Sequence, residues 1–125
     1  MFKEIGLLAL AGAAGTLCRY GLAGAVQKLS GAGFPWGTLM VNAAGCLLFG
    51  FVWTLGEERL LISGQTRFIV LTGFMGAFTT FSTFAFETGA FLQDSSWRLA
   101  AGNLAANNAV GLICLFLGLS LGRFV

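Results

Sequence analysis

Four long apolar runs, separated by short polar or glycine-rich stretches, dominate the hydrophobic pattern of this chain. They cover about residues 5–26, 36–55, 68–92 and 99–121. About 20 apolar residues are needed to cross the hydrocarbon core of a bilayer, so each run predicts one membrane-spanning helix. The pattern therefore predicts an all-α integral membrane protein, with a single four-helix transmembrane domain over residues 1–125.

The third run departs from a plain lipid-facing helix in its middle. Residues 73–84 read GFMGAFTTFSTF, with two glycines and four hydroxyl residues among phenylalanines. Glycine costs about 1 kcal/mol in a helix, and hydroxyl side chains compete for backbone partners. We expect the third helix to be broken near the membrane midplane. The alternative is a continuous helix whose hydroxyls bond to the preceding turn.

Further polar residues inside the runs are candidates for function. Asn42 is an amide in mid-run, either an interhelical hydrogen-bonding group or a pore-facing donor. Glu87 is either a functional acid or an interfacial carboxylate in water. Arg19 either snorkels to the interface or faces a carbonyl or a water-filled vestibule.

Two helix faces gather further candidates. Phe81 and Phe84 are three residues apart and share a face, a spacing that also suits ordinary packing. Ser82 and Thr83 could line a polar path. On the fourth run, Asn103 and Asn107 are one turn apart, forming either a helix-packing seam or one wall of a polar track.

Composition supports the membrane assignment and excludes several classes. Of 125 residues, 57% are hydrophobic and 10% are charged, whereas soluble domains average about 25% charged residues. The net charge of +2 is too small to predict a nucleic-acid-binding protein. The chain has no histidine, and its three cysteines are far apart and predicted to be buried free thiols. The sequence shows no nucleophile–base pair and no metal-ligand cluster, so it does not predict an enzyme.

The distribution of basic residues is nearly balanced between the two sides. Four crossings put both termini on one side, together with Lys3, Arg59, Arg67 and Arg123, while Lys28 and Arg98 lie on the other. This bias is too small for the positive-inside rule to fix an orientation. The simplest inference is insertion in both orientations, which permits an antiparallel pair.

Three motifs resemble one known family. The run at residues 73–84, GAAGTLCRY at 12–20 and GTLMVN at 37–42 resemble the signatures of the Fluc (CrcB-like) fluoride channels of microbes. The length and the four-helix layout also match, so the resemblance covers essentially the whole chain. It implies an antiparallel, dual-topology homodimer that exports fluoride passively across the inner (plasma) membrane and relieves fluoride toxicity.

The resemblance also implies roles for individual residues. Asn42, Phe81 and Phe84 match pore residues, and Arg19 matches a vestibule arginine. The backbone carbonyls of Gly76 and Thr79 match those that hold a central structural Na⁺ at the dimer interface, with no organic cofactor. The remaining candidates, which fall on or near the family's polar track, are Thr38, Ser82, Thr83 and Glu87.

One departure concerns the fourth helix. Many relatives carry a tyrosine and, four residues later, a serine, and we align these positions with Asn103 and Asn107. With asparagine at both positions, this face of the fourth helix can still form hydrogen bonds, but it lacks the phenol group of the tyrosine.

The chemistry of the matched residues suits fluoride, which is small and strongly hydrated and so requires donors in place of water. The Asn42 amide offers N–H groups, and the ring edges of Phe81 and Phe84 are positive. A central cation offsets the cost of a negative charge at low dielectric.

Two other functions compete with a fluoride channel. A small proton-coupled, dual-topology transporter requires an acid midway along the first helix, where this chain has only Glu4, near the start. A structural membrane subunit would use the glycines for packing alone.

Overall fold

A computed structural model describes residues 2–125, which are almost entirely helical. The helices are α1 (Phe2–Ser30), α2 (Trp36–Glu57), α3 (Gly64–Phe68), the π-helical segment η1 (Ile69–Met75), α4 (Gly76–Phe78), α5 (Phe81–Gln93) and α6 (Trp97–Phe124). They make up four spans of 29, 22, 30 and 28 residues, the third being Gly64–Gln93, and each is long and apolar enough to cross a membrane. The prediction of an all-α protein with four such helices is confirmed.

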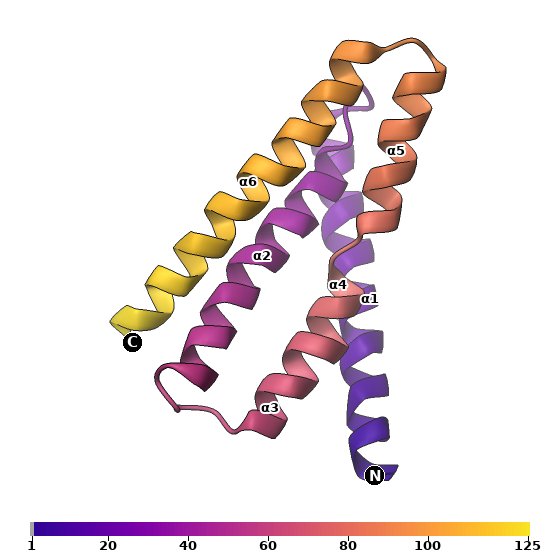
Figure 1. Cartoon of the computed structure of the whole chain (residues 1–125). Coiled ribbons are helices and arrows are strands. Elements are labelled where there is room, and N and C mark those ends of the chain that lie inside the picture. The colour runs from indigo at the N-terminus through magenta and orange to yellow at the C-terminus, as the bar shows by residue number, and fades with distance from the viewer. Residues whose placement is uncertain (1) are drawn as a thin grey trace.

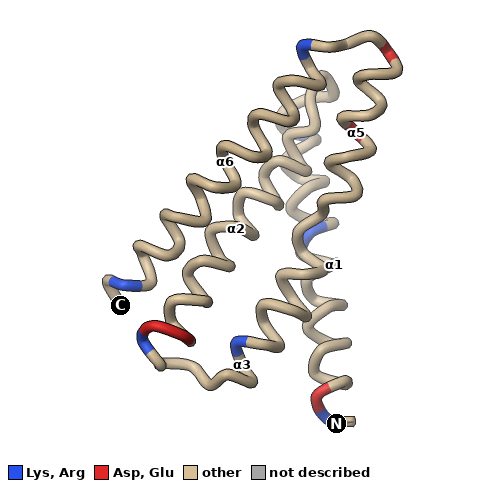
Figure 2. Tube along the Cα trace, in the orientation of Figure 1, with Lys and Arg blue, Asp and Glu red and all other residues tan. Residues whose placement is uncertain are grey.

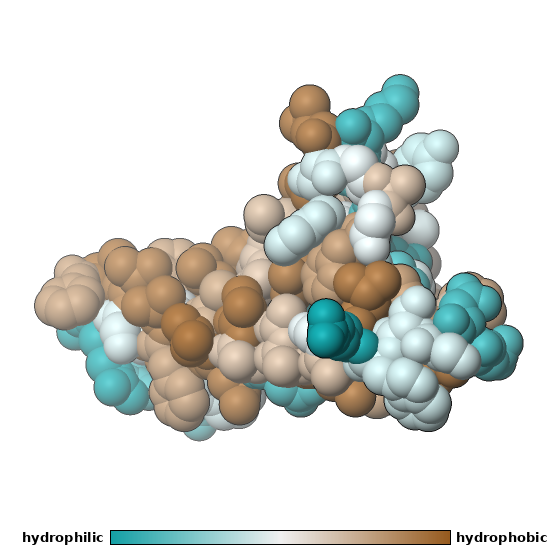
Figure 3. All heavy atoms as spheres, turned by 90° about the horizontal axis from the view of Figure 1, so that it is seen from above, coloured by the Kyte–Doolittle hydropathy of each residue, from teal (hydrophilic) through white to brown (hydrophobic). Residues whose placement is uncertain are grey.

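The spans run alternately in opposite directions, so both termini lie at one end (Figure 1). The main contact is between α2 and α6, which run in the same direction side by side. In the part of the chain that is described, α1 packs on η1, α4 and α2 but makes no contact with α6, while α5 packs mainly on α6. Figure 3 shows an open shape in which one arm stands out from the main body.

Glycines bring α2 and α6 into backbone contact. A Cβ atom on Gly118 would lie 2.0 Å from the Leu47 carbonyl oxygen, and one on Gly50 would lie 2.4 Å from the Leu115 carbonyl oxygen. Small residues at such positions let membrane helices approach closely enough for van der Waals packing, where no hydrophobic force drives association. The α2–α6 seam is therefore a closely packed wall of the fold.

The first helix continues to Ser30, beyond the expected end near residue 26. Gly31 ends it with a φ of +85°, and its N–H donates to the Gln27 carbonyl at 3.1 Å. A glycine in this left-handed conformation is a common helix stop. Earlier in the same helix, a Cβ on Gly15 would lie 2.3 Å from the Phe74 carbonyl oxygen, so α1 and η1 also touch through backbone.

Two residues of the third span have extended backbone. Thr79 has φ −86° and ψ 158°, and Thr80 has φ −147° and ψ 108°. The Thr80 side chain accepts a hydrogen bond from the Thr83 N–H at 3.2 Å, which caps the start of α5. A threonine N-cap satisfies one of the free N–H groups at a helix start, so this sequence supports a new helix at Phe81.

Most of the surface is apolar, and the buried core is small. The buried hydrophobic residues are Val41, Ala43, Leu71, Met75, Phe78, Phe84 and Ala100. Large apolar side chains stand outward elsewhere, as the brown surface in Figure 3 shows, while charged residues lie mostly near the two ends (Figure 2). This distribution suits a chain whose sides face lipid.

Two ion pairs join the ends of neighbouring helices on the side of the molecule that holds both termini. Arg123 binds both carboxylate oxygens of Glu58, at 2.8 Å and 3.1 Å, and Arg67 pairs with Glu57. The hydrogen bond from Arg123 holds the pKa of the exposed Glu58 carboxyl below its ordinary value. The Arg67 guanidinium also lies over the Trp53 ring, 4.9 Å from its centroid.

The α2–α6 seam generates a stability prediction. We expect Gly118→Ala to lower the stability of the folded chain by about 1–3 kcal/mol, the usual cost of overpacking, because the added methyl group meets the Leu47 backbone. The measurement is the thermal unfolding midpoint in detergent. Gly102→Ala is the matched control on α6, since a Cβ there meets only the Phe34 ring, at 3.9 Å. Equal midpoints for the two variants would contradict the prediction.

Candidate functional site

The site is built around Asn42, which holds the extended residue Thr80. The Thr80 N–H donates to the Asn42 Oδ1 at 2.8 Å, and the Asn42 Nδ2 donates to the Thr80 carbonyl at 3.2 Å. Extended backbone takes the Thr80 N–H out of the helical ladder, and a buried backbone N–H without a partner is costly. One amide side chain from α2 therefore satisfies the backbone of the third span where its helix is interrupted.

A row of side chains, which we call the amide chain, continues from Asn42 through Asn107 and Asn103 to Thr88. The Asn42 Nδ2 also donates to the Asn107 Oδ1 at 3.0 Å, and the Asn107 Nδ2 donates to the Asn103 Oδ1 at 2.9 Å. Asn103 is fully buried and donates to the Thr88 Oγ1 at 3.0 Å. The Thr88 hydroxyl in turn donates to the Phe84 carbonyl at 2.8 Å. The amide chain thus links α2, α6 and α5 through the interior.

Thr38 and Glu87 form a second polar contact, separate from the amide chain. The Thr38 hydroxyl donates to the Glu87 Oε1 at 2.6 Å. The other carboxylate oxygen, Oε2, is buried and has no hydrogen-bond partner among the described residues. Thr38 lies one turn before Asn42 on α2, so both candidates lie on the same side of that helix.

The two phenylalanines differ in environment. Phe84 is 6% exposed and packed inside, whereas Phe81 is 78% exposed on this chain. Their rings meet edge to face, with centroids 5.5 Å apart. Ser82 and Thr83 are exposed beside them at the start of α5, and the Thr80 hydroxyl donates to the Thr83 Oγ1 at 2.9 Å.

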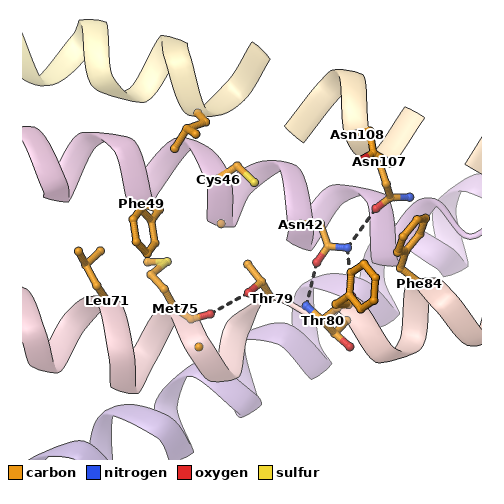
Figure 4. Close-up of a pocket in the computed structure, with 14 residues that line it drawn as sticks. Asn42, Cys46, Phe49, Leu71, Met75, Thr79, Thr80, Phe84, Asn107 and Asn108 are labelled. Carbon is orange, nitrogen blue, oxygen red and sulfur yellow. Dashed lines mark hydrogen bonds between the residues drawn. The ribbon is translucent and has the colours of Figure 1, made fainter. Parts of the chain in front are cut away.

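These groups border a cavity of about 480 Å³. Its polar lining comes from three asparagines, Asn42, Asn107 and Asn108, and from the two extended threonines. Apolar side chains such as Phe49, Leu71 and Met75 line most of the rest. Figure 4 shows Asn42 at the centre of this lining, bonded to Thr80 on one side and to Asn107 on the other. An apolar pocket with a few convergent polar groups is the usual form of a small-ligand site.

Oxygen ligands for a cation are available only from backbone and uncharged groups near this cavity. No cluster of three or more His, Cys, Asp or Glu side chains occurs within residues 2–125. In a continuous α-helix, the Gly76 and Thr79 carbonyls would accept from the N–H groups of Thr80 and Thr83. Those N–H groups donate instead to the Asn42 Oδ1 and the Thr80 Oγ1.

Close packing fixes Thr79 beside α2. A Cβ on Gly45 would lie 2.1 Å from the Thr79 Cγ2 atom, so a larger residue at position 45 would force the Thr79 side chain to move. The Thr79 hydroxyl donates to the Met75 carbonyl at 3.0 Å. Gly76 is exposed, and a Cβ on it would meet nothing within 4 Å.

Other candidates lie apart from this arrangement. Arg19 is half-buried on α1 and makes no hydrogen bond or ion pair with the described residues. The three cysteines are free, as expected, but Cys18 is exposed on this chain rather than buried, because it lies on the open side of α1.

Two residues of the site were missed by the sequence reasoning. Thr80 supplies both backbone groups that hold Asn42, and Thr88 closes the amide chain. The spacing of Thr80 and Thr83 was a signal, because a hydroxyl residue whose side chain reaches the N–H three residues later is typical of a helix start. Nothing in the sequence distinguishes Thr88 from the hydroxyl residues around it.

Comparison with known proteins identifies the family of this chain. The sequence model of the family described as "CrcB-like protein, Camphor Resistance (CrcB)" matches residues 6–119. A protein of Nitrosococcus oceani named "Fluoride-specific ion channel FluC" is 61% identical over 125 residues, covering 100% of both chains. Proteins with the same name from Solidesulfovibrio magneticus and Desulforapulum autotrophicum are 52% identical, covering 100% of both chains, and 51% identical, covering 94% of both. The chain therefore belongs to the CrcB-like family.

Proposed function

We infer that this chain forms a fluoride channel that lets fluoride leave the cell passively and so relieves fluoride toxicity. Its relatives of 50–61% identity carry the name "Fluoride-specific ion channel FluC" and match it over nearly their whole length. Membership of a channel family sets the chain apart from enzymes. With four membrane-spanning helices, it is a multi-pass protein of the cell membrane.

The observation that carries this proposal is the amide of Asn42 at the edge of the cavity. A pore for a small hydrated anion has to replace water with N–H or O–H donors. The Asn42 Nδ2 lies in the polar part of an otherwise apolar cavity, where its two hydrogens are donated to the Thr80 carbonyl and the Asn107 Oδ1. Its carbonyl oxygen is held by Thr80, so the donor end of the side chain is the one turned toward Asn107.

The aromatic and polar side chains extend this pathway along α5. Phe81 and Phe84 can present positive ring edges to an anion while excluding water. Phe81 is exposed on a single copy of the chain. We propose that a second copy covers Phe81 and that its ring lines a pore formed between the two copies. Thr38, Glu87, Ser82 and Thr83, with Asn103 and Asn107, form the polar track, and Arg19 faces the vestibule.

We propose that the whole chain is one domain and that two copies assemble as an antiparallel, dual-topology homodimer. The balanced basic residues permit both orientations. The exposed Gly76 and the exposed Phe81 leave a face near the interruption open to a partner. In this arrangement the interruption lies near the membrane midplane, where non-helical backbone must be covered by protein.

We further propose that Gly76 and Thr79 carbonyls from both copies hold a structural Na⁺ at the dimer centre. These carbonyls have lost their usual helical donors, and uncharged oxygens suit a hard cation. Bound there, a cation would lower the cost of an anion nearby at low dielectric. A proton-coupled transporter has less support, because the only acid of α1, Glu4, lies in its first turn.

The first prediction concerns ion selectivity and Asn42. Liposomes loaded with fluoride and containing the wild-type protein should lose fluoride quickly and retain chloride. Asn42→Asp should slow the fluoride loss at least about tenfold, because it removes N–H donors to a charged ligand. Electrode recordings of fluoride and chloride efflux provide the measurement. Equal loss of both ions from the wild type, or of neither, would rule out the proposed function.

The second prediction separates a pore role for Phe81 from ordinary packing. Phe81→Ile should lower fluoride efflux several-fold, because isoleucine keeps the bulk but has no positive ring edge. Phe86→Ile is the matched control, since Phe86 is on the same helix and is 76% exposed. A structural membrane subunit predicts no transport change in either variant, and an unchanged efflux in Phe81→Ile would refute the pore role.

The third prediction concerns the cation. A crystal structure of the protein grown in sodium salts should show a small density on a two-fold axis, with short contacts to the carbonyl oxygens of Gly76 and Thr79. Growth in a bulky organic cation in place of sodium should remove this density. A continuous α-helix through both residues, or an empty centre in sodium, would contradict the site.

A further inference from the structure

The hydrogen bonds of the amide chain all run in one direction. The Thr80 N–H donates to Asn42, Asn42 to Asn107, Asn107 to Asn103, Asn103 to Thr88, and Thr88 to the Phe84 carbonyl. Both hydrogens of the Asn42 Nδ2 have acceptors, the Thr80 carbonyl and the Asn107 Oδ1. In this polarity the amide chain presents no free donor at Asn42.

This polarity does not suit an anion beside Asn42. The Asn107 Oδ1 lies 3.0 Å from the Asn42 Nδ2 and occupies one of the positions an anion would need. An amide oxygen carries a partial negative charge and would repel the anion, whereas an amide nitrogen would donate to it. The Asn107 side chain thus competes with the anion for the Asn42 donor in one orientation and binds the anion in the other.

The opposite polarity keeps the side-chain hydrogen bonds inside the amide chain and gives up one bond to backbone, from the Asn107 Nδ2 to the Asn103 carbonyl at 3.2 Å. A half-turn of the Asn107 amide exchanges its oxygen and nitrogen, and the matching half-turn of Asn103 turns its Nδ2 to the Asn107 Oδ1. The Thr88 hydroxyl, which can donate or accept, then donates to the Asn103 Oδ1. The Phe84 carbonyl loses only this side-chain donor and stays within α5. The terminal torsion of asparagine is broad and roughly two-fold, so both orientations are accessible.

We propose that the amide chain is a two-state relay in which a small, strongly hydrogen-bonding anion selects the reversed polarity. In that state Asn107 becomes a second N–H ligand, and the anion lies between the amides of Asn42 and Asn107. A ligand shifts such an equilibrium by its difference in affinity for the two states. This inference rests on the proposed fluoride channel and deepens it by naming a specificity-determining residue on the fourth helix.

The direct test is nuclear magnetic resonance of the full chain with ¹⁵N-labelled asparagine in lipid nanodiscs. Sodium fluoride should shift the side-chain N–H signals of both Asn42 and Asn107 and produce couplings between ¹⁹F and both Nδ2 nuclei. Sodium chloride at the same concentration should leave them unchanged. If fluoride couples to Asn42 alone, the relay is wrong while the channel stands; if liposomes lose no fluoride at all, the proposed function itself fails.

Variants of Asn107 give opposite expectations for the two possible roles. If Asn107 is an anion ligand, Asn107→Leu should lower fluoride efflux about 10- to 100-fold, as expected for losing a hydrogen bond to a charged ligand. If Asn107 only competes for the Asn42 donor, Asn107→Leu should leave efflux unchanged or raise it, which would overturn the proposal. Asn107→Ser, whose hydroxyl can donate, should recover part of the loss.

Thr54→Val serves as the control for weakened contact between α2 and α6. The Thr54 hydroxyl donates to the Leu119 carbonyl at 3.3 Å, and neither residue lines the cavity. Removing this hydroxyl in Thr54→Val should leave fluoride efflux at the wild-type level. Because the spectroscopic test uses the unmodified protein, a variant that fails to fold does not decide the question.

Discussion

The two backbone groups of Thr80 impose the constraint on which the rest of this structure depends. Inside a span that crosses lipid, backbone groups at an interrupted helix need partners from the protein itself. Asn42 meets both needs with one side chain, accepting at 2.8 Å and donating at 3.2 Å. Its position therefore has to be fixed, and α2 is held in place by backbone contact with α6 on one side and by α1 on the other. The cavity, the amide chain and the start of α5 all follow from this arrangement.

Short side chains can form the amide chain only because the helices lie so close together. Glycines on α2 and α6 allow carbonyl oxygens to lie within about van der Waals distance of the facing helix. At that separation, Asn107 on α6 reaches Asn42 on α2, whereas two helices spaced by leucine would leave the Asn42 amide without this partner. Of the two alternatives for the fourth helix, the packing seam is present on α6, where glycines supply it, and the asparagines of the same helix form the amide chain.

The sequence predicted the spans better than the contacts between them. Hydropathy identifies four crossings because lipid exposure leaves a uniform composition, and helical spacing placed Asn103 and Asn107 on one face. It could not pair Thr38 with Glu87, because 49 residues separate them and only the fold brings them together. Nor did it separate the buried Phe84 from the exposed Phe81, because a shared face does not say how each ring meets its neighbours. The end of α1 was misplaced because the capping glycine, Gly31, is one of two glycines in that loop.

The interruption at Thr79 and Thr80 also has an electrostatic consequence. Each helix end carries a partial charge of about half an elementary unit, positive at the N-terminus and negative at the C-terminus. Ending α4 at Phe78 and starting α5 at Phe81 creates one end of each sign within a few residues, in the middle of a span. The aligned peptide dipoles thus place a negative pole beside the free carbonyls at the end of α4 and a positive pole beside the free N–H groups at the start of α5. One local change of backbone direction gives this uncharged stretch of chain a built-in field that favours opposite ions on its two sides.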